Sequence, residues 1–106
     1  KPIIVAGVSD SAAIGALQAA EAADRPNHVW TAGQLAEPAA REIIACDKHL
    51  VASVAQFPGR FGRVAVPAIV AAMDGEEVPA QLEAEMALVT ADNVRELFPD
   101  TPACND

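Results

Sequence analysis

The sequence is poor in basic residues. It has seven Lys and Arg against fifteen Asp and Glu in 106 residues, which gives a formal net charge of −8. The basic residues are scattered along the chain, whereas proteins that bind nucleic acid present clusters of Lys and Arg to the phosphates. We therefore expect no nucleic-acid partner, and we attribute the acidic balance to a solvated surface.

Long apolar runs are absent as well. The chain is 52% hydrophobic, but charged residues or proline interrupt every apolar stretch before the roughly 20 residues that a membrane-spanning helix needs. Much of the hydrophobic fraction is alanine, which buries little area, so the core must come from the larger aliphatic and aromatic side chains. The length suits a single domain with one modest core.

Cysteine is scarce, and the chain has no methionine at its start. Cys46 and Cys104 have neither metal-ligand spacing nor a C-x-x-C arrangement, which leaves two reduced thiols or one disulfide as alternatives. The chain begins with Lys1-Pro2 and carries no signal peptide, a beginning that suggests a processed or excised polypeptide. Export is therefore not visible in the sequence itself.

What is present is a regular alternation of apolar runs and helical patterns. Strands are expected at 3–6, 28–32, 50–56 and 83–90, and helices at 12–23, 38–46, 60–73 and 91–97. This β-α-β-α-β-α-β-α order with short connections predicts an α/β fold, with a three-layer arrangement of a mostly parallel sheet and helices on both faces. Residues 99–106 are expected to form a frayed tail.

Polar side chains follow the first three predicted strands. Ser9 and Asp10 come after the first strand, Gln34 after the second and Gln56 after the third. The carboxyl ends of parallel strands meet at one edge of the sheet, where ligands of open α/β sheets bind. We expect this row to offer hydrogen bonds to a polyhydroxylated ligand, with Gln56 as the first candidate for a ligand contact.

Catalytic motifs are not convincing. Gly7-Val8-Ser9-Asp10-Ser11 lies between a strand and a helix, as a hydrolase nucleophile elbow does, but the second glycine of G-x-S-x-G is missing. Helix capping explains its serines and aspartate without chemistry. No phosphate loop or dinucleotide fingerprint is present, and His28 and His49 lack partner ligands at useful spacing. We therefore expect a binding protein that is not an enzyme and uses no cofactor or metal.

Three blocks of sequence, in this order and spacing, resemble a known family. They are IIVAGVSDSAAIGALQAAEAA, then VASVAQFPGRFGRVAVPAIVAAMDGEEVP, then ALVTADNV. The chain is similar over residues 3 to 98 to the periplasmic sugar-binding proteins of bacterial ABC importers, of the ribose-binding type. The resemblance implies a sugar-like small-molecule ligand, the membrane subunits of an ABC importer as partners of the intact protein, and a periplasmic or extracytoplasmic location.

The resemblance also assigns site residues. The segment after the first strand carries a polar ligand-binding residue in the family, which maps onto Ser9, with Asp10 adjoining it. The VAQFP segment carries a glutamine that contacts the sugar, and this sequence keeps it as Gln56. One segment departs from the pattern, because the family usually has an aspartate after the second strand. Here the segment is Thr31-Ala32-Gly33-Gln34-Leu35, so that either Gln34 replaces the acid or the ligand is not an ordinary pentose or hexose.

The matched part of the family is its last third, in proteins of two lobes joined by three crossings. Residues 1–56 resemble the second half of the C-terminal lobe, 57–82 an N-lobe helix and loop, and 83–98 a return strand with a short helix, followed by the tail 99–106. Phe57, Pro58 and Gly59 would form a hinge at one crossing, and lobe closure around the ligand would be the working motion.

Two other hypotheses remain open. One is an effector-binding domain fragment of a lactose-repressor-type transcription regulator, which shares the fold; the LVTADNV ending and the acidic charge favour the transporter protein. The other is a small doubly wound α/β module without a ligand site of its own. For the chain alone we expect weak or absent sugar binding. We also expect homo-oligomers, since the helix at 60–73 would expose Phe61, Val64, Ile69 and Met73.

Overall fold

The computed structural model describes residues 1–104 and divides the chain into two compact units. The first, here called the sheet unit, comprises Lys1–Ala55 together with the chain from Ala87 onward. The second, called the helix unit, comprises Gln56–Met86. The helix unit is thus an insertion between two strands of the sheet unit.

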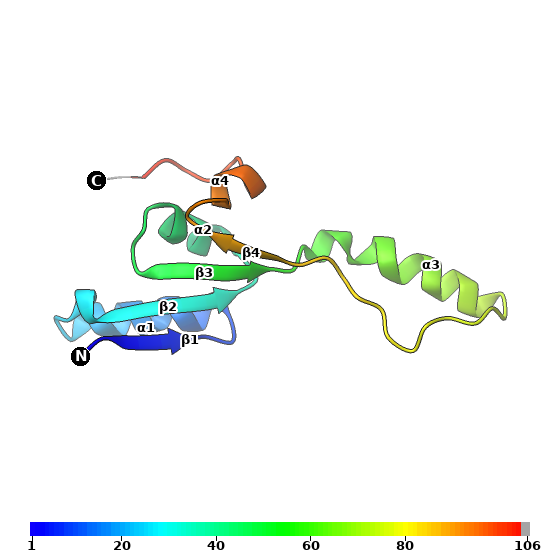
Figure 1. The fold of residues 1–106 in the computed structure, drawn as a ribbon, viewed down its shortest axis with the longest axis horizontal. Coiled ribbons are helices and arrows are strands. Elements are labelled where there is room, and N and C mark those ends of the chain that lie inside the picture. Colours follow the sequence, from blue (N-terminus) through cyan, green and yellow to red (C-terminus); the bar gives the residue numbers. More distant parts are fainter. Residues whose placement is uncertain (105–106) are drawn as a thin grey trace. The chain divides into compact units, whose positions relative to one another are not determined.

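The sheet unit is built on four strands in the spatial order β1-β2-β3-β4 (Figure 1). The strands are β1 (Ile3–Ala6), β2 (Val29–Gln34), β3 (Leu50–Ala55) and β4 (Ala87–Thr90). β1, β2 and β3 are mutually parallel, and β4 is antiparallel to β3. The prediction of an α/β fold with a mostly parallel sheet flanked by helices is confirmed.

The helices of the sheet unit connect these strands. α1 (Asp10–Ala22) and a 3₁₀ turn, η1 (Pro26–His28), lead from β1 to β2, and α2 (Pro38–Ala45) leads from β2 to β3. Right-handed crossovers between strands laid down in the order 1-2-3 place both helices on the same face of the sheet, and Figure 1 shows α1 and α2 together behind the strands. The short helix α4 (Val94–Leu97) follows β4 and contacts α2.

The prediction of helices on both faces is corrected: within the described residues α1 and α2 cover the same face, because the parallel strands follow one another in the order 1-2-3 without a reversal. Burial along the strands follows from this one-sided cover. In β2, Val29, Thr31 and Gly33 are buried, while the residues between them are half-buried. On the other face the cover is thinner, and Ile4 is 83% exposed and Leu88 59% exposed. The core therefore lies between the sheet and its helices, and its largest fully buried apolar side chains are Ile44, Leu50, Val89 and Val94.

Several predicted boundaries shift for local reasons. α1 begins at Asp10 because the hydroxyl of Ser9 accepts a hydrogen bond from the N–H of Ala12 and caps the helix. The strand predicted at 83–90 is wrong in its first half. β4 begins only at Ala87, which pairs with Ala55, the last residue of β3; before Ala87 no β3 residue remains to pair with.

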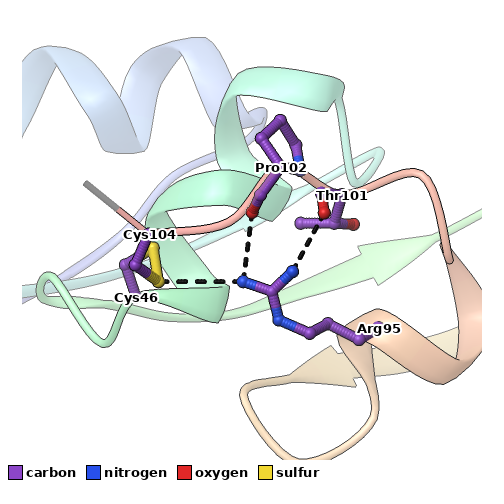
Figure 2. Close-up of a disulfide and its surroundings, with 5 residues drawn as sticks. All are labelled: Cys46, Arg95, Thr101, Pro102 and Cys104. Carbon is purple, nitrogen blue, oxygen red and sulfur yellow. Dashed lines mark hydrogen bonds between the residues drawn. A yellow bond between two sulfur atoms is a disulfide. The ribbon is translucent and has the colours of Figure 1, made fainter.

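The predicted tail is also corrected, because the chain is held as far as Cys104. Cys46, at the end of α2, forms a disulfide with Cys104, which decides between the two alternatives that the sequence left open. Arg95 lies beside this bond (Figure 2). Its guanidinium donates to the carbonyl oxygens of Thr101 and Pro102 at 2.9 and 3.1 Å. Residues 105 and 106 of the predicted tail lie outside the described residues.

The helix unit contains a 3₁₀ turn, η2 (Pro58–Arg60), the helix α3 (Phe61–Met73), and the returning segment up to Met86. Arg60 forms an ion pair with Glu85 at 2.7 Å and lies over the ring of Phe57. None of the residues of this unit is buried, and Met73 is 80% exposed. The unit therefore has no hydrophobic core of its own.

Candidate functional site: the carboxyl edge of the sheet

The carboxyl edge of the sheet unit is formed by the segments that follow β1 and β2. Ser9 and Asp10 come after β1, and Gln34 ends β2. Gly7 joins the first of these segments to the second strand, because its N–H donates to the carbonyl oxygen of Ala32 at 2.8 Å. Three of the predicted site residues thus lie at one edge of one sheet.

Ser9 acts as the N-cap of α1. Its extended backbone and its hydroxyl, which accepts from Ala12 N–H at 3.3 Å, are typical of a capping serine. The hydroxyl proton is not used in this bond, so that a ligand oxygen could accept it. The prediction that Ser9 contacts a ligand stays a prediction.

Asp10, which was predicted beside Ser9 as a ligand contact, lies inside the protein, and its role toward a ligand stays a prediction. Its side chain has 0% exposure. Its Oδ1 accepts from the hydroxyl of Ser53 at 2.6 Å, and its Oδ2 accepts from the N–H of Glu37 at 2.7 Å. Both carboxylate oxygens are therefore engaged inside the protein, in short charge-assisted hydrogen bonds.

Asp10 also depends on Gly33. A Cβ atom built on Gly33 would lie 2.9 Å from the Cα of Asp10 and closer still to its carboxylate. Only glycine leaves room for the start of α1 to approach β2 so closely. The aspartate and the glycine are therefore parts of one arrangement.

The loop between β2 and α2, here called the strand-end loop (Leu35–Glu37), has an unusual backbone. Leu35 and Ala36 have φ angles of 99° and 52°, values that non-glycine residues rarely adopt. Such positions cost on the order of 1–3 kcal/mol each and persist where the surroundings hold them. The loop that follows Gln34 is therefore strained.

Side chains from three elements satisfy the backbone of the strand-end loop. Ser53 of β3 accepts from the N–H of Ala36 at 2.9 Å, and Arg41 of α2 donates from Nε to the Ala36 carbonyl at 2.5 Å. Asp10 of α1 accepts from the N–H of Glu37. The guanidinium of Arg41 in turn lies 3.8 Å over the ring of Phe98. These contacts fix the loop between β2 and α2.

Gln34 lies directly before this loop and is exposed. Its backbone pairs with Val54 in the sheet, and the N–H of the next residue, Leu35, donates to the carbonyl of Val54 at 2.8 Å. The nearest acid after Gln34 in the sequence, Glu37, is half-buried, and its N–H donates a hydrogen bond to Asp10. Gln34 thus stands at the edge of the sheet, as predicted, and its role toward a ligand stays a prediction.

Gln56 is the first residue of the helix unit, directly after β3. It is half-buried and lines a hollow of about 500 Å³ within that unit, whose other lining residues are Phe61, Gln81, Glu83, Ala84 and Met86. A glutamine amide in such a hollow can both donate and accept hydrogen bonds. This suits a ligand with several hydroxyl groups.

The predicted hinge residues follow Gln56. Phe57 has a left-handed backbone with φ 48°, Pro58 begins η2, and Gly59 has open space around the position of a Cβ. The division between the two units falls one residue earlier, between Ala55 and Gln56. Motion at this place stays a prediction.

Metal-binding clusters, the two histidines and membrane-spanning helices were the other features considered in the sequence. No group of three or more His, Cys, Asp or Glu that could hold a metal ion occurs in residues 1–104. His49 stacks on Trp30 with ring centroids 4.8 Å apart, and its Nδ1 lies 2.8 Å from the Val29 carbonyl oxygen, while His28 is exposed in η1. In the same part of the chain no helix is long and apolar enough to cross a membrane.

The sequence did not reveal Ser53, Arg41 and Gly33 as parts of this arrangement. Ser53 interrupts the apolar run Leu50–Ala55, and a lone hydroxyl in a buried strand signals an internal hydrogen-bond partner. That partner, Asp10, is 43 residues away in the sequence. Gly33 lies within a strand, where a glycine often marks the close approach of another backbone segment.

Among solved structures, the chain matches solute-binding proteins of ABC transporters. A Bacillus halodurans C-125 solute-binding protein with bound myo-inositol is 33% identical, with a TM-score of 0.76, over 93% of this chain. The Caulobacter myo-inositol-binding protein is 28% identical, with a TM-score of 0.73, over 89% of this chain. No protein-family model and no curated protein matches.

A third match shows the fold at lower identity. It is a periplasmic solute-binding protein from Actinobacillus succinogenes 130z with bound D-allose, 22% identical over 88% of this chain with a TM-score of 0.75. In all three cases the chain spans only about a third of the matched protein, 32 to 34%. The chain therefore has the fold of one part of an ABC-transporter periplasmic solute-binding protein of the sugar-binding kind.

Proposed function

We propose that this chain is the C-terminal part of an extracytoplasmic solute-binding protein that delivers a sugar or a cyclic polyol to an ABC importer. The observation that carries the proposal is the 33% identity, over 93% of the chain, to a solute-binding protein with bound myo-inositol. Ser9 and Gln34 at the carboxyl edge of the sheet unit support it, as does Gln56 in the helix unit, because hydroxyl and amide groups can hold a polyhydroxylated ligand without catalysing a reaction. The membrane subunits of the importer would be the partner of the intact protein.

The Cys46–Cys104 disulfide supports an extracytoplasmic location. Disulfides persist in oxidising compartments such as the periplasm and are rare in the cytosol. A cytosolic transcription regulator of the same fold would not be expected to carry one. The disulfide therefore weighs against the repressor-type alternative.

Ligand capture would work by hinge closure at Phe57-Pro58-Gly59, where the chain leaves the sheet unit. The matched proteins are about three times as long as this chain, so we expect the isolated 106 residues to lack part of the surface that encloses the ligand.

Calorimetry with myo-inositol and D-allose tests the proposal. We expect the isolated chain to bind with a Kd in the millimolar range or weaker, which corresponds to about 4 kcal/mol of binding free energy or less. A polypeptide that carries this chain within the full length of its relatives should bind one such compound at least a hundredfold more tightly, and Gln56→Ala should weaken that binding. Sub-micromolar affinity in the isolated chain, or no polyol binding by the longer polypeptide, would contradict the proposal.

A further inference from the structure

A buried carboxylate without a buried cation beside it needs a reason. Asp10 has 0% exposure, and the hydrogen bonds that it accepts come from a serine hydroxyl and a backbone N–H. Charged side chains are almost never fully buried unless they are fully hydrogen-bonded. What these bonds hold in place is the strand-end loop.

The two bonds act on the same strained segment. Ser53 links Asp10 to the loop, because its Oγ donates a hydrogen bond to Asp10 and accepts one from the N–H of Ala36 at 2.9 Å. Asp10 binds the next N–H along the loop, that of Glu37. The two successive N–H groups at the end of the positive-φ segment are thus both held, one by Asp10 and one by Ser53.

The residues of the loop do not favour this backbone by themselves. Neither Leu35 nor Ala36 is a glycine, so both pay a steric penalty at their φ angles of 99° and 52°. Ala36 itself is fully buried. Without the bonds from Ser53 and Asp10, the buried N–H of Ala36 and the partly buried N–H of Glu37 would lose their acceptors, and we expect the segment to relax to ordinary negative φ values.

We propose that Asp10 and Ser53 are positioning residues of the ligand site: they hold the strand-end loop in its strained conformation and thereby fix Gln34 at the carboxyl edge of the sheet. The part that concerns ligand affinity rests on the proposed function; the part that concerns the loop does not. Arg41, which binds the Ala36 carbonyl from α2, completes the arrangement from the other side.

The test uses the 106-residue chain, labelled with ¹⁵N and ¹³C, and four variants. Ser53→Ala removes the acceptor of Ala36 N–H and the donor to Asp10, and Ser53→Thr keeps the hydroxyl. Val29→Ala is the matched control, because it empties a buried site at the far end of β2 without touching the loop. The double variant Ser53→Ala/Ala36→Gly leaves the hydrogen bonds broken but lets residue 36 adopt a positive φ without steric penalty.

The first measurement is independent of any ligand. In Ser53→Ala we expect the amide protons of residues 36 and 37 to exchange about ten- to a hundredfold faster than in the parent chain. The backbone chemical shifts of residues 35 and 36 should change from values typical of a positive φ to values typical of a negative φ. Val29→Ala should leave these signals in place, and Ser53→Thr and the glycine double variant should restore the positive-φ shifts. Unchanged loop shifts in Ser53→Ala, in a chain that remains folded, would overturn the inference.

The second measurement is a titration with myo-inositol at millimolar concentrations. We expect Ser53→Ala to weaken binding about tenfold, Val29→Ala to leave it within twofold, and the glycine double variant to recover most of the loss. If the parent chain and the longer polypeptide do not bind, the proposed function fails while the loop measurement still decides the positioning role. If they bind and Ser53→Ala shifts the loop without weakening binding, the positioning of the ligand site is refuted.

Discussion

Cys46 and Cys104 form a disulfide across 58 residues of sequence, and the loop that it closes contains the whole helix unit, Gln56–Met86. One covalent bond thus joins the end of α2 to the chain beyond α4. The residues between them leave the sheet unit after β3 and return to it at β4.

Reduction of this disulfide should destabilise the sheet unit. Closing a loop of this length removes chain entropy from the unfolded state. By the relation between loop length and chain entropy, opening the loop should lower the free energy of unfolding by about 4 kcal/mol, within the roughly 2–5 kcal/mol usual for small domains. Urea unfolding with and without a reductant measures it. The Cys46→Ser/Cys104→Ser variant is the control, since the reductant should have no effect on it; an unchanged unfolding midpoint of the parent chain on reduction would contradict the expectation.

Limited proteolysis should cut the helix unit first. This unit has no buried residue, and local opening is easiest where few apolar contacts hold the chain. Trypsin should therefore cleave after the exposed Arg63 before it cleaves within α2 after Arg41. The two fragments should migrate as one species without reductant and separate with it, because Cys46 and Cys104 lie on opposite sides of the cut. The variant Arg60→Gln/Arg63→Gln should resist this first cut; early cleavage at Arg41 instead would show that the sheet unit opens more easily.

Replacing Asp10 should destabilise the fold even without a ligand. Asp10→Ala leaves the Ser53 hydroxyl and the Glu37 N–H without their acceptor, at an expected loss of about 3 kcal/mol in the free energy of unfolding. Glu21→Ala is a matched control on an exposed position of the same helix and should change stability by less than about 0.5 kcal/mol. Equal effects of the two substitutions in thermal unfolding would mean that the carboxylate of Asp10 is not engaged as described.

Two glycine-to-alanine substitutions should act in opposite directions. Gly33→Ala places a Cβ against the Asp10 carboxylate and should destabilise the chain by about 1–3 kcal/mol, as is typical of overpacking. Gly15→Ala, in the middle of α1 with open space around its Cβ position, should stabilise it by about 0.5–1 kcal/mol. Denaturant unfolding compares the two, and a stabilised Gly33→Ala would contradict the close packing of α1 on β2.

Self-association of the isolated chain should depend on α3. Ile69 and Met73 are exposed along this apolar helix, and a second copy of the helix could cover them. Sedimentation velocity should show a concentration-dependent dimer in the parent chain and monomer in Ile69→Asp. A monomeric parent chain at high concentration would refute this prediction.

The strands and helices could be predicted because their signals are local. Apolar runs such as Leu50–Ala55 and the proline at the start of α2 are visible within a few residues. The extent of β4 could not be predicted in the same way, since it depends on where β3 ends and how the two strands align. The anchored tail depends on a bond between Cys46 and Cys104, for which the sequence offered two alternatives.

The site residues also differ in whether their roles follow from nearby residues or from distant ones. The capping role of Ser9 and the place of Gln34 at a strand end follow from neighbouring residues. The burial of Asp10 does not, because an aspartate after a strand looks the same whether its carboxylate faces solvent or a serine of another strand. Ser53, the hydrogen-bond partner of Asp10, belongs to a strand two positions away in the sheet from β1. Its hydroxyl signals an internal partner, but the sequence does not show which group that is.

An NMR titration of the 106-residue chain with myo-inositol and D-allose tests the central proposal, part of a sugar- or polyol-binding protein, most directly. We predict saturable shifts, with a millimolar Kd, at the backbone amides of Ser9, Gln34 and Gln56, and smaller or no shifts at the exposed residues of α1. Gln56→Ala should weaken the saturable response to the bound compound. Shifts that stay linear up to the solubility limit for both compounds, in this chain and also in the polypeptide of its relatives' full length, would contradict it. Saturable shifts that leave these three residues unaffected would contradict it as well.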